Sequence, residues 1–124
     1  MARDQIRGTA IRFFVIALSA SANAAEVRAV YSPAQYLKNF ALSVCLSEAY
    51  KSDELVKDSR AAAGAYLELG SLPFEAYEDV AALGRTFLAR DYRGISGQPL
   101  MLMKCIDFFH SQELDRLTQR YIKK

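Results

Sequence analysis

Histidine is nearly absent from this chain, and cysteine and proline are scarce: 124 residues include one His, two Cys and three Pro. With His110 as its only histidine, the sequence has no group of His, Cys and carboxylate residues at metal-ligand spacing. It also lacks a Gly-x-Ser-x-Gly turn, a phosphate-binding glycine loop and a dinucleotide-binding fingerprint. We therefore expect no metal, no other cofactor and no enzymatic activity.

The sequence offers one possible catalytic pair, in which Cys105 is the nucleophile and His110 is its base. Five positions apart on one helix, the two side chains would point about 140° away from each other. His110 is better explained as a residue at a helix end. A cysteine hydrolase is the weakest of the functional alternatives.

The sequence has no hydrophobic run long enough to cross a membrane, which takes roughly 20 residues. Its apolar run over residues 13–20 is less than half that length, follows three arginines and precedes the small-residue sequence Ala22-Asn23-Ala24. This pattern is typical of a secretory signal peptide, and a membrane anchor is the competing interpretation. We predict a signal peptide over residues 1–24, cleaved after Ala24, and one exported domain over residues 25–124.

Neither sign of charge dominates once the predicted signal peptide, the leader, is removed. The chain has 16 Lys and Arg against 14 Asp and Glu, and the leader contains three arginines and one aspartate. Residues 25–124 therefore have 13 basic and 13 acidic residues, a formal net charge of zero. A neutral domain has no electrostatic attraction to nucleic acid or to an anionic membrane, so we expect neither as a partner.

The two cysteines, Cys45 and Cys105, lie 60 positions apart. In an exported chain two cysteines are most simply one disulfide, because the compartment beyond the inner membrane is oxidising. Closing a loop of that length should stabilise the fold by roughly 4 kcal/mol in the chain-entropy model. Two reduced, buried cysteines are the alternative.

Helical periodicity and helix-capping residues recur along the whole exported part, and no alternating strand pattern appears. Gly70 marks one helix end, and Ser71-Leu72-Pro73 the start of the next. We predict an all-α fold, a single compact bundle of about five helices with one internal disulfide. The predicted helices are a first from Ser32 to about Tyr50, a second from Ser52 to Gly70, a third from Ser71 to before Asp91, a fourth from Leu100 to Phe109 and a fifth from Ser111 to about Tyr121.

The fourth predicted helix is the most apolar, since only Lys104 and Asp107 are strongly polar between Leu100 and Phe109. A helix that is apolar on most of its circumference should be surrounded by other elements. We predict that it is the central helix, with Lys104 and Asp107 sharing one narrow polar face. In the third helix, Phe74 should face inward, and Gly84 should mark a tight contact between helices.

Two surfaces could bind a partner. One is an acidic surface on the third helix, and the other is the loop before the fourth helix, where Tyr92 stands between opposite charges. A solvated helix face and a connector whose tyrosine folds back on the core are the corresponding alternatives. The acidic surface comprises Glu75, Glu78 and Asp79; the loop contributes Asp91, Tyr92, Arg93, Gly94, Ser96 and Gln98.

The segment Gln98–Asp115, with its Lys-Cys-Ile-Asp and Ser-Gln-Glu-Leu-Asp motifs, resembles the type VI secretion amidase immunity family. The likeness extends to Tyr36–Cys45 and to Ala61–Gly70, and so covers most of residues 31–121. The members in question are the immunity partners of the family-four peptidoglycan amidase effectors, related to the resistance-associated immunity proteins.

The resemblance implies a small, all-helical, periplasmic protein that is commonly a homodimer. Such a protein binds an amidase injected by sibling cells and occludes its active-site groove. The amidases are papain-like cysteine peptidases that cut the γ-D-glutamyl–diaminopimelate bond of the peptide stem. Family members contact the effector through a helix face and a protruding loop, which favours effector binding by the two surfaces given above. A disulfide-stapled periplasmic chaperone of the acid-stress type is the alternative function.

Overall fold

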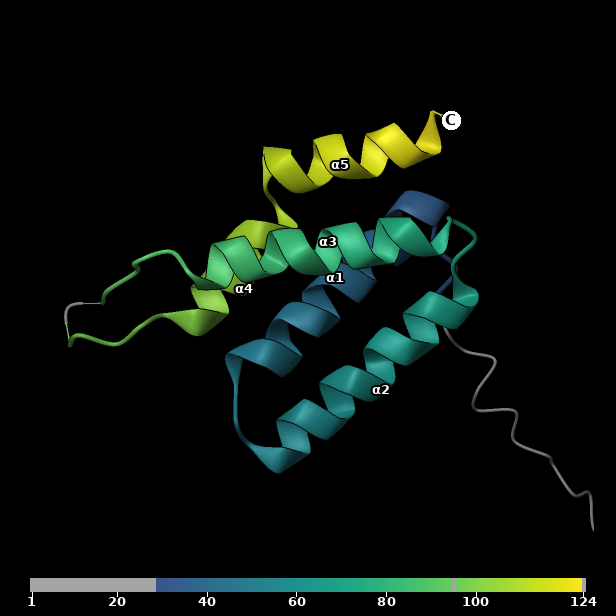
Figure 1. Ribbon diagram of the computed structural model, residues 1–124. Coiled ribbons are helices and arrows are strands. Elements are labelled where there is room, and N and C mark those ends of the chain that lie inside the picture. Colours follow the sequence, from purple (N-terminus) through teal and green to yellow (C-terminus); the bar gives the residue numbers. More distant parts are fainter. Residues whose placement is uncertain (1–28, 95, 124) are drawn as a thin grey trace, which may run out of the picture.

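The computed structural model describes residues 29–94 and 96–123, so the predicted signal peptide lies outside the described residues. The described residues form five α-helices and no strand, which confirms the all-α prediction (Figure 1). None of these helices is long and apolar enough to span a membrane. The helices are α1 (Pro33–Ala49), α2 (Asp53–Leu69), α3 (Phe74–Leu88), α4 (Met101–Phe109) and α5 (Gln112–Ile122).

Local side-chain chemistry sets several of the helix ends. Ser32 and Gln35 form a reciprocal capping box at the start of α1, with N–H to side-chain oxygen distances of 3.2 and 2.9 Å. Ser111 caps α5 by accepting a hydrogen bond from the Leu114 N–H at 3.1 Å. Gly70 ends α2, and its N–H donates to the Tyr66 carbonyl. The start and end signals read from the sequence are confirmed at these positions.

The central helix is α1, which packs against each of the other four helices. It is buried on two opposite faces: Leu37, Ala41 and Cys45 on one, and Ser43 and Ser47 on the other. Both serines can be buried because their hydroxyls donate to backbone carbonyls of α1 itself, at 2.8 Å. The prediction that the fourth helix is central is therefore wrong.

Helix α4 is short and lies at one end of the bundle (Figure 1). The neighbouring helices leave part of its apolar surface uncovered: Leu102, Met103 and Ile106 are 51%, 50% and 45% exposed. The inward prediction for Phe74 is also wrong, since this first residue of α3 is 62% exposed.

A disulfide joins the central helix to α4, as predicted. Cys45 and Cys105 are both buried, with their Cα atoms 5.7 Å apart. Gly84 of α3 lies so close to α4 that a Cβ atom there would be 2.9 Å from Cε2 of Phe108. The tight helix contact predicted at Gly84 is confirmed. The disulfide and this contact fix α4 against both α1 and α3.

Candidate binding surface

The two predicted surfaces lie at opposite ends of α3. Glu75, Glu78 and Asp79 belong to its first two turns, and the α3–α4 loop (residues 89–100, all described except residue 95) leaves its other end. The loop protrudes beyond the helices in Figure 1. A helix of 15 residues is about 22 Å long, so the structure does not bring the two surfaces into contact.

The acidic surface is exposed at all three positions, as predicted. Asp79 is also a structural residue, because its carboxylate accepts a hydrogen bond from the Tyr121 hydroxyl and so links α3 to α5. That hydrogen bond is the main reason why the pKa of Tyr121 is raised above its usual value. This inter-helix bond could not be read from the sequence, since the two residues are 42 positions apart.

In the loop, Tyr92 is half-buried and folds back onto α4. Its hydroxyl donates a hydrogen bond to Asp107 Oδ2 at 2.8 Å, and the Lys104 ammonium lies 5.9 Å from its ring centroid. The hydrogen bond to Asp107 raises the pKa of Tyr92. The base of the loop is therefore attached to α4.

Asp107 and Lys104 lie on one side of α4, as their three-residue spacing predicts, but Asp107 is exposed whereas Lys104 is buried. Lys104 is only 5% exposed, and its Nζ atom donates to the backbone carbonyl of Leu88 at 3.0 Å. Leu88 is the last residue of α3, where unpaired carbonyls and the helix dipole favour a positive charge. Lys104 thus joins the end of α3 to α4 beneath the loop.

The outer part of the loop closes on itself. The Gly94 N–H donates to the Gln98 carbonyl and the Gly97 N–H to the Gly94 carbonyl, both at 2.9 Å. Gly97 has φ +77°, a conformation that glycine adopts without strain. Asp91 and Arg93 form an exposed ion pair of 2.9 Å, which contributes little to stability. Ser96 and Gln98 are exposed as well.

The exposed residues Leu102, Met103 and Ile106 form an apolar α4 face that begins directly after the loop. Sequence reasoning missed this surface because it placed the whole helix inside the bundle. Exposed apolar side chains grouped on one face are typical of interaction surfaces. The loop and the apolar α4 face therefore follow each other directly along the chain.

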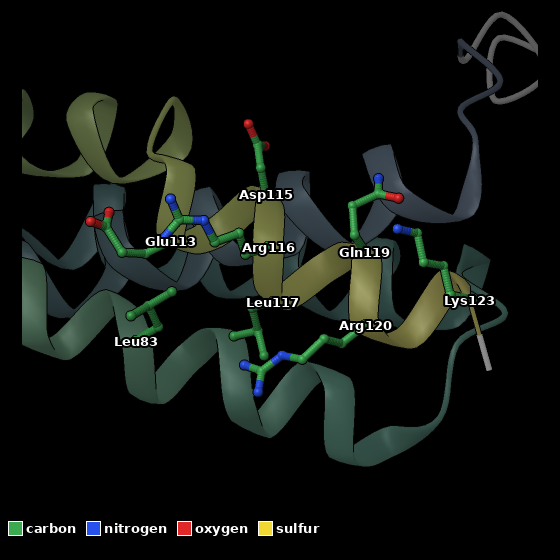
Figure 2. A pocket seen from close by; sticks show the side chains of 8 residues that line it. All are labelled: Leu83, Glu113, Asp115, Arg116, Leu117, Gln119, Arg120 and Lys123. Carbon is green, nitrogen blue, oxygen red and sulfur yellow. The ribbon is translucent and has the colours of Figure 1, made fainter.

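A groove of about 780 Å³ lies along α5 and the middle of α3 (Figure 2). Its walls combine basic and acidic side chains over two leucines, with no histidine or cysteine among them. The groove is therefore a mixed-charge surface between two helices. It is lined by Leu83, Glu113, Asp115, Arg116, Leu117, Gln119, Arg120 and Lys123.

The hydrolase alternative conflicts with the structure. Cys105 is fully buried and bonded to Cys45, so it offers no thiolate. His110 is the C-terminal cap residue of α4, as predicted, and is exposed. Within residues 29–94 and 96–123, no three His, Cys, Asp or Glu side chains are grouped closely enough to bind a metal ion.

Comparisons with known proteins identify a group of relatives. The family model described as type VI secretion system amidase immunity protein (Tai4) matches residues 35–118. A chain of the Tae4/Tai4 effector–immunity structure from Salmonella typhimurium is 41% identical, with a TM-score of 0.69, over 73% of this chain and 89% of that one. A search of curated proteins gives no match.

Two further structures are similar at 25% identity. One is the Tae4–Tai4 complex from Enterobacter cloacae, with a TM-score of 0.65 over 72% of this chain and 91% of that one. The other is a complex of Tae4 from Salmonella typhimurium with Tai4 from Enterobacter cloacae, with a TM-score of 0.64 over 71% and 91%.

Proposed function

The chain belongs to the family of type VI secretion system amidase immunity proteins, and on this basis we propose that it binds a type VI-secreted peptidoglycan amidase and occludes its active site. The family match, which runs from α1 into α5, is the observation that carries the proposal. The cell that makes the protein would thereby be protected from amidases injected by its siblings. The same match favours this function over that of an acid-stress chaperone.

The protein performs no chemistry in this account. Occlusion needs a rigid surface that fits the groove of the amidase, and it needs no catalytic group. The protruding loop supports this mode of action, since a projecting segment can enter a groove that a flat helix face cannot. We assign the contact to Asp91, Tyr92, Arg93, Gly94, Ser96 and Gln98 of the loop, and to Glu75, Glu78 and Asp79 of α3.

The two surfaces are compatible with one effector. A standard interface buries about 800 Å² on each partner, a patch roughly 30 Å across. The length of α3, about 22 Å, lies within that span. In a homodimer, one subunit could instead contribute the loop and the other the acidic surface.

We also propose that the protein acts in the periplasm as a homodimer. The predicted signal peptide would export residues 25–124 to the compartment in which the amidase cuts the wall. The apolar α4 face supports self-association, because burying Leu102, Met103 and Ile106 against a second copy removes apolar surface from water. N-terminal sequencing of the exported protein should give Ala25 as its first residue.

Binding can be tested with purified Tae4 from Salmonella typhimurium or with an amidase encoded beside this chain. Residues 25–124 should co-elute with the amidase in size-exclusion chromatography. Arg93→Glu, in the loop, should weaken the complex at least tenfold. Arg60→Glu is a matched control on the exposed side of α2, and it should leave the affinity unchanged. Equal effects of the two substitutions would remove the loop from the interface.

A further inference from the structure

Three residues contact the connection that precedes α4: its N-cap residue Leu100, and Lys104 and Asp107 within the helix. Lys104 and Asp107 are three positions apart, which places them on one side of the helix, whereas Leu100 precedes the helical residues and has a left-handed backbone. We call these residues the loop-facing stripe. Each one contacts a different part of the connection between α3 and α4.

Leu100 contacts the outer part of the loop. Its side chain lies against Gly94, where an added Cβ would be 3.2 Å from the leucine Cδ2 atom. Leu100 has φ +53°, a left-handed conformation that is unfavourable for a leucine. The left-handed backbone of Leu100 thus coincides with a side-chain contact to Gly94.

Lys104 and Asp107 contact the base of the loop. Lys104 is buried, and its ammonium group joins α4 to the Leu88 carbonyl at the point where α3 ends and the loop begins. Asp107 accepts the hydrogen bond from Tyr92, four residues further along the loop. The loop-facing stripe therefore contacts Leu88 at the end of α3, and Tyr92 and Gly94 in the loop.

We propose that the loop-facing stripe of α4 fixes the α3–α4 loop in one conformation before the effector binds, and that Tyr92 is a positioning residue whose hydroxyl serves this purpose. The inference rests on the proposed function, because it concerns the loop that we assign to the amidase interface. A loop that must be ordered during binding lowers the affinity, whereas an ordered loop avoids that loss. The hydroxyl of Tyr92 is already bonded within the protein and acts on binding through the shape of the loop.

The first test measures loop order in the protein alone. Hydrogen exchange of the Gly94 and Gly97 amides reports the two hydrogen bonds that close the loop. Tyr92→Phe removes the bond to Asp107, and we expect both amides to exchange about fivefold faster, the usual effect of losing one hydrogen bond. Amides in α1 should not change. Unchanged exchange at Gly94 and Gly97 would overturn the proposal.

A matched control removes another tyrosine hydroxyl bonded to an aspartate. Tyr121→Phe deletes the bond to Asp79 between α5 and α3, away from the loop, and should leave exchange at Gly94 and Gly97 unchanged. Asp107→Ala removes the partner of Tyr92 and should reproduce the exchange seen in Tyr92→Phe. If Tyr121→Phe accelerated exchange in the loop as much as Tyr92→Phe, the effect would be global and the proposal would fail.

The second test measures affinity for the amidase. Tyr92→Phe and Asp107→Ala should each weaken binding about two- to fivefold, and the double variant should be no weaker than either one, because both remove the same bond. If the Gly94 and Gly97 amides exchanged faster while the affinity for the amidase stayed the same, the proposed role in binding would be overturned. It would also be overturned if the losses of affinity in the two single variants added up fully in the double variant. If the wild-type protein does not bind the amidase, the proposed function fails, and the exchange measurement still decides whether α4 fixes the loop.

Discussion

Gly84 of α3 packs directly on the ring of Phe108 of α4, and a methyl group on Gly84 would be 2.9 Å from the ring carbon Cε2. Phe108 is fully buried, so an added methyl group would push its ring against the surrounding core. The glycine thus sets the spacing between the two helices that the loop connects.

We expect Gly84→Ala to destabilise the protein. Alanine is the better helix former by about 1 kcal/mol, but overpacking a closed core costs about 1–3 kcal/mol. The net result should be a lower midpoint of thermal unfolding, measured by circular dichroism. Gly64→Ala in α2 is the matched control: its added Cβ meets nothing within 4 Å, so only the helix propensity changes and the midpoint should rise. A rise in both variants would contradict the tight contact.

Removing the disulfide should destabilise the oxidised protein. Cys105→Ala opens the link between α1 and α4, and the loss should approach roughly 4 kcal/mol, reduced by any structure left in the unfolded chain. The free energy of unfolding is measured by urea titration with and without reductant. Under reducing conditions the variant and the wild type should differ only by the small cavity that the sulfur leaves. An equal difference in both conditions would mean that packing matters and the bond does not.

Stability should fall at alkaline pH because of Tyr77. Burial raises the pKa of this phenol above its ordinary value of about 10. The folded state therefore binds the phenolic proton more tightly than the unfolded chain. This contribution is complete below pH 10 and is lost as pH rises through the folded-state pKa. The wild-type free energy of unfolding should drop more steeply than that of Tyr77→Phe above pH 10, and parallel curves would contradict this role.

The apolar α4 face should control self-association. Ile106→Glu places a charge on an exposed position, so the monomer should fold normally and a dimer that uses this face should dissociate. Light scattering after size-exclusion chromatography measures the molar mass. Glu54→Gln on the exposed side of α2 is a control that should leave the mass unchanged. A variant with the same mass as the wild type would exclude this face from the dimer interface.

Short-range signals in the sequence predict the fold well. The capping box of Ser32 and Gln35 and the glycine at position 70 act between residues three or four positions apart, so the pattern itself contains both partners. The disulfide of Cys45 and Cys105 was also predictable, because an exported chain with two cysteines offers only one intramolecular pairing.

The sequence misplaces the centre of the bundle for a physical reason. Ser43 and Ser47 are polar, but α1 satisfies their hydroxyls internally and can therefore bury them. Helix α4 looks like a core helix, yet at nine residues it is too short to contact neighbours on every side. Hydrophobicity alone does not tell how much of a helix its neighbours cover.

The arrangement of the loop was the least predictable part. Tyr92 and Asp107 are 15 positions apart, and Lys104 bonds a backbone carbonyl, which no side-chain pattern can reveal. The sequence did indicate the loop as a surface, from the opposite charges on either side of Tyr92. It did not indicate that α4 both buries the lysine and fixes the tyrosine.

Inhibition of a peptidoglycan amidase is the property that most directly defines the proposed function. Purified residues 25–124 should be titrated into a Tae4-type amidase while release of cut peptide stems from isolated peptidoglycan is measured. We expect amidase activity to fall in proportion to the added protein. It should vanish when the amount of added protein provides one binding site for each amidase molecule. Full amidase activity at a stoichiometric excess of the protein would contradict the central claim.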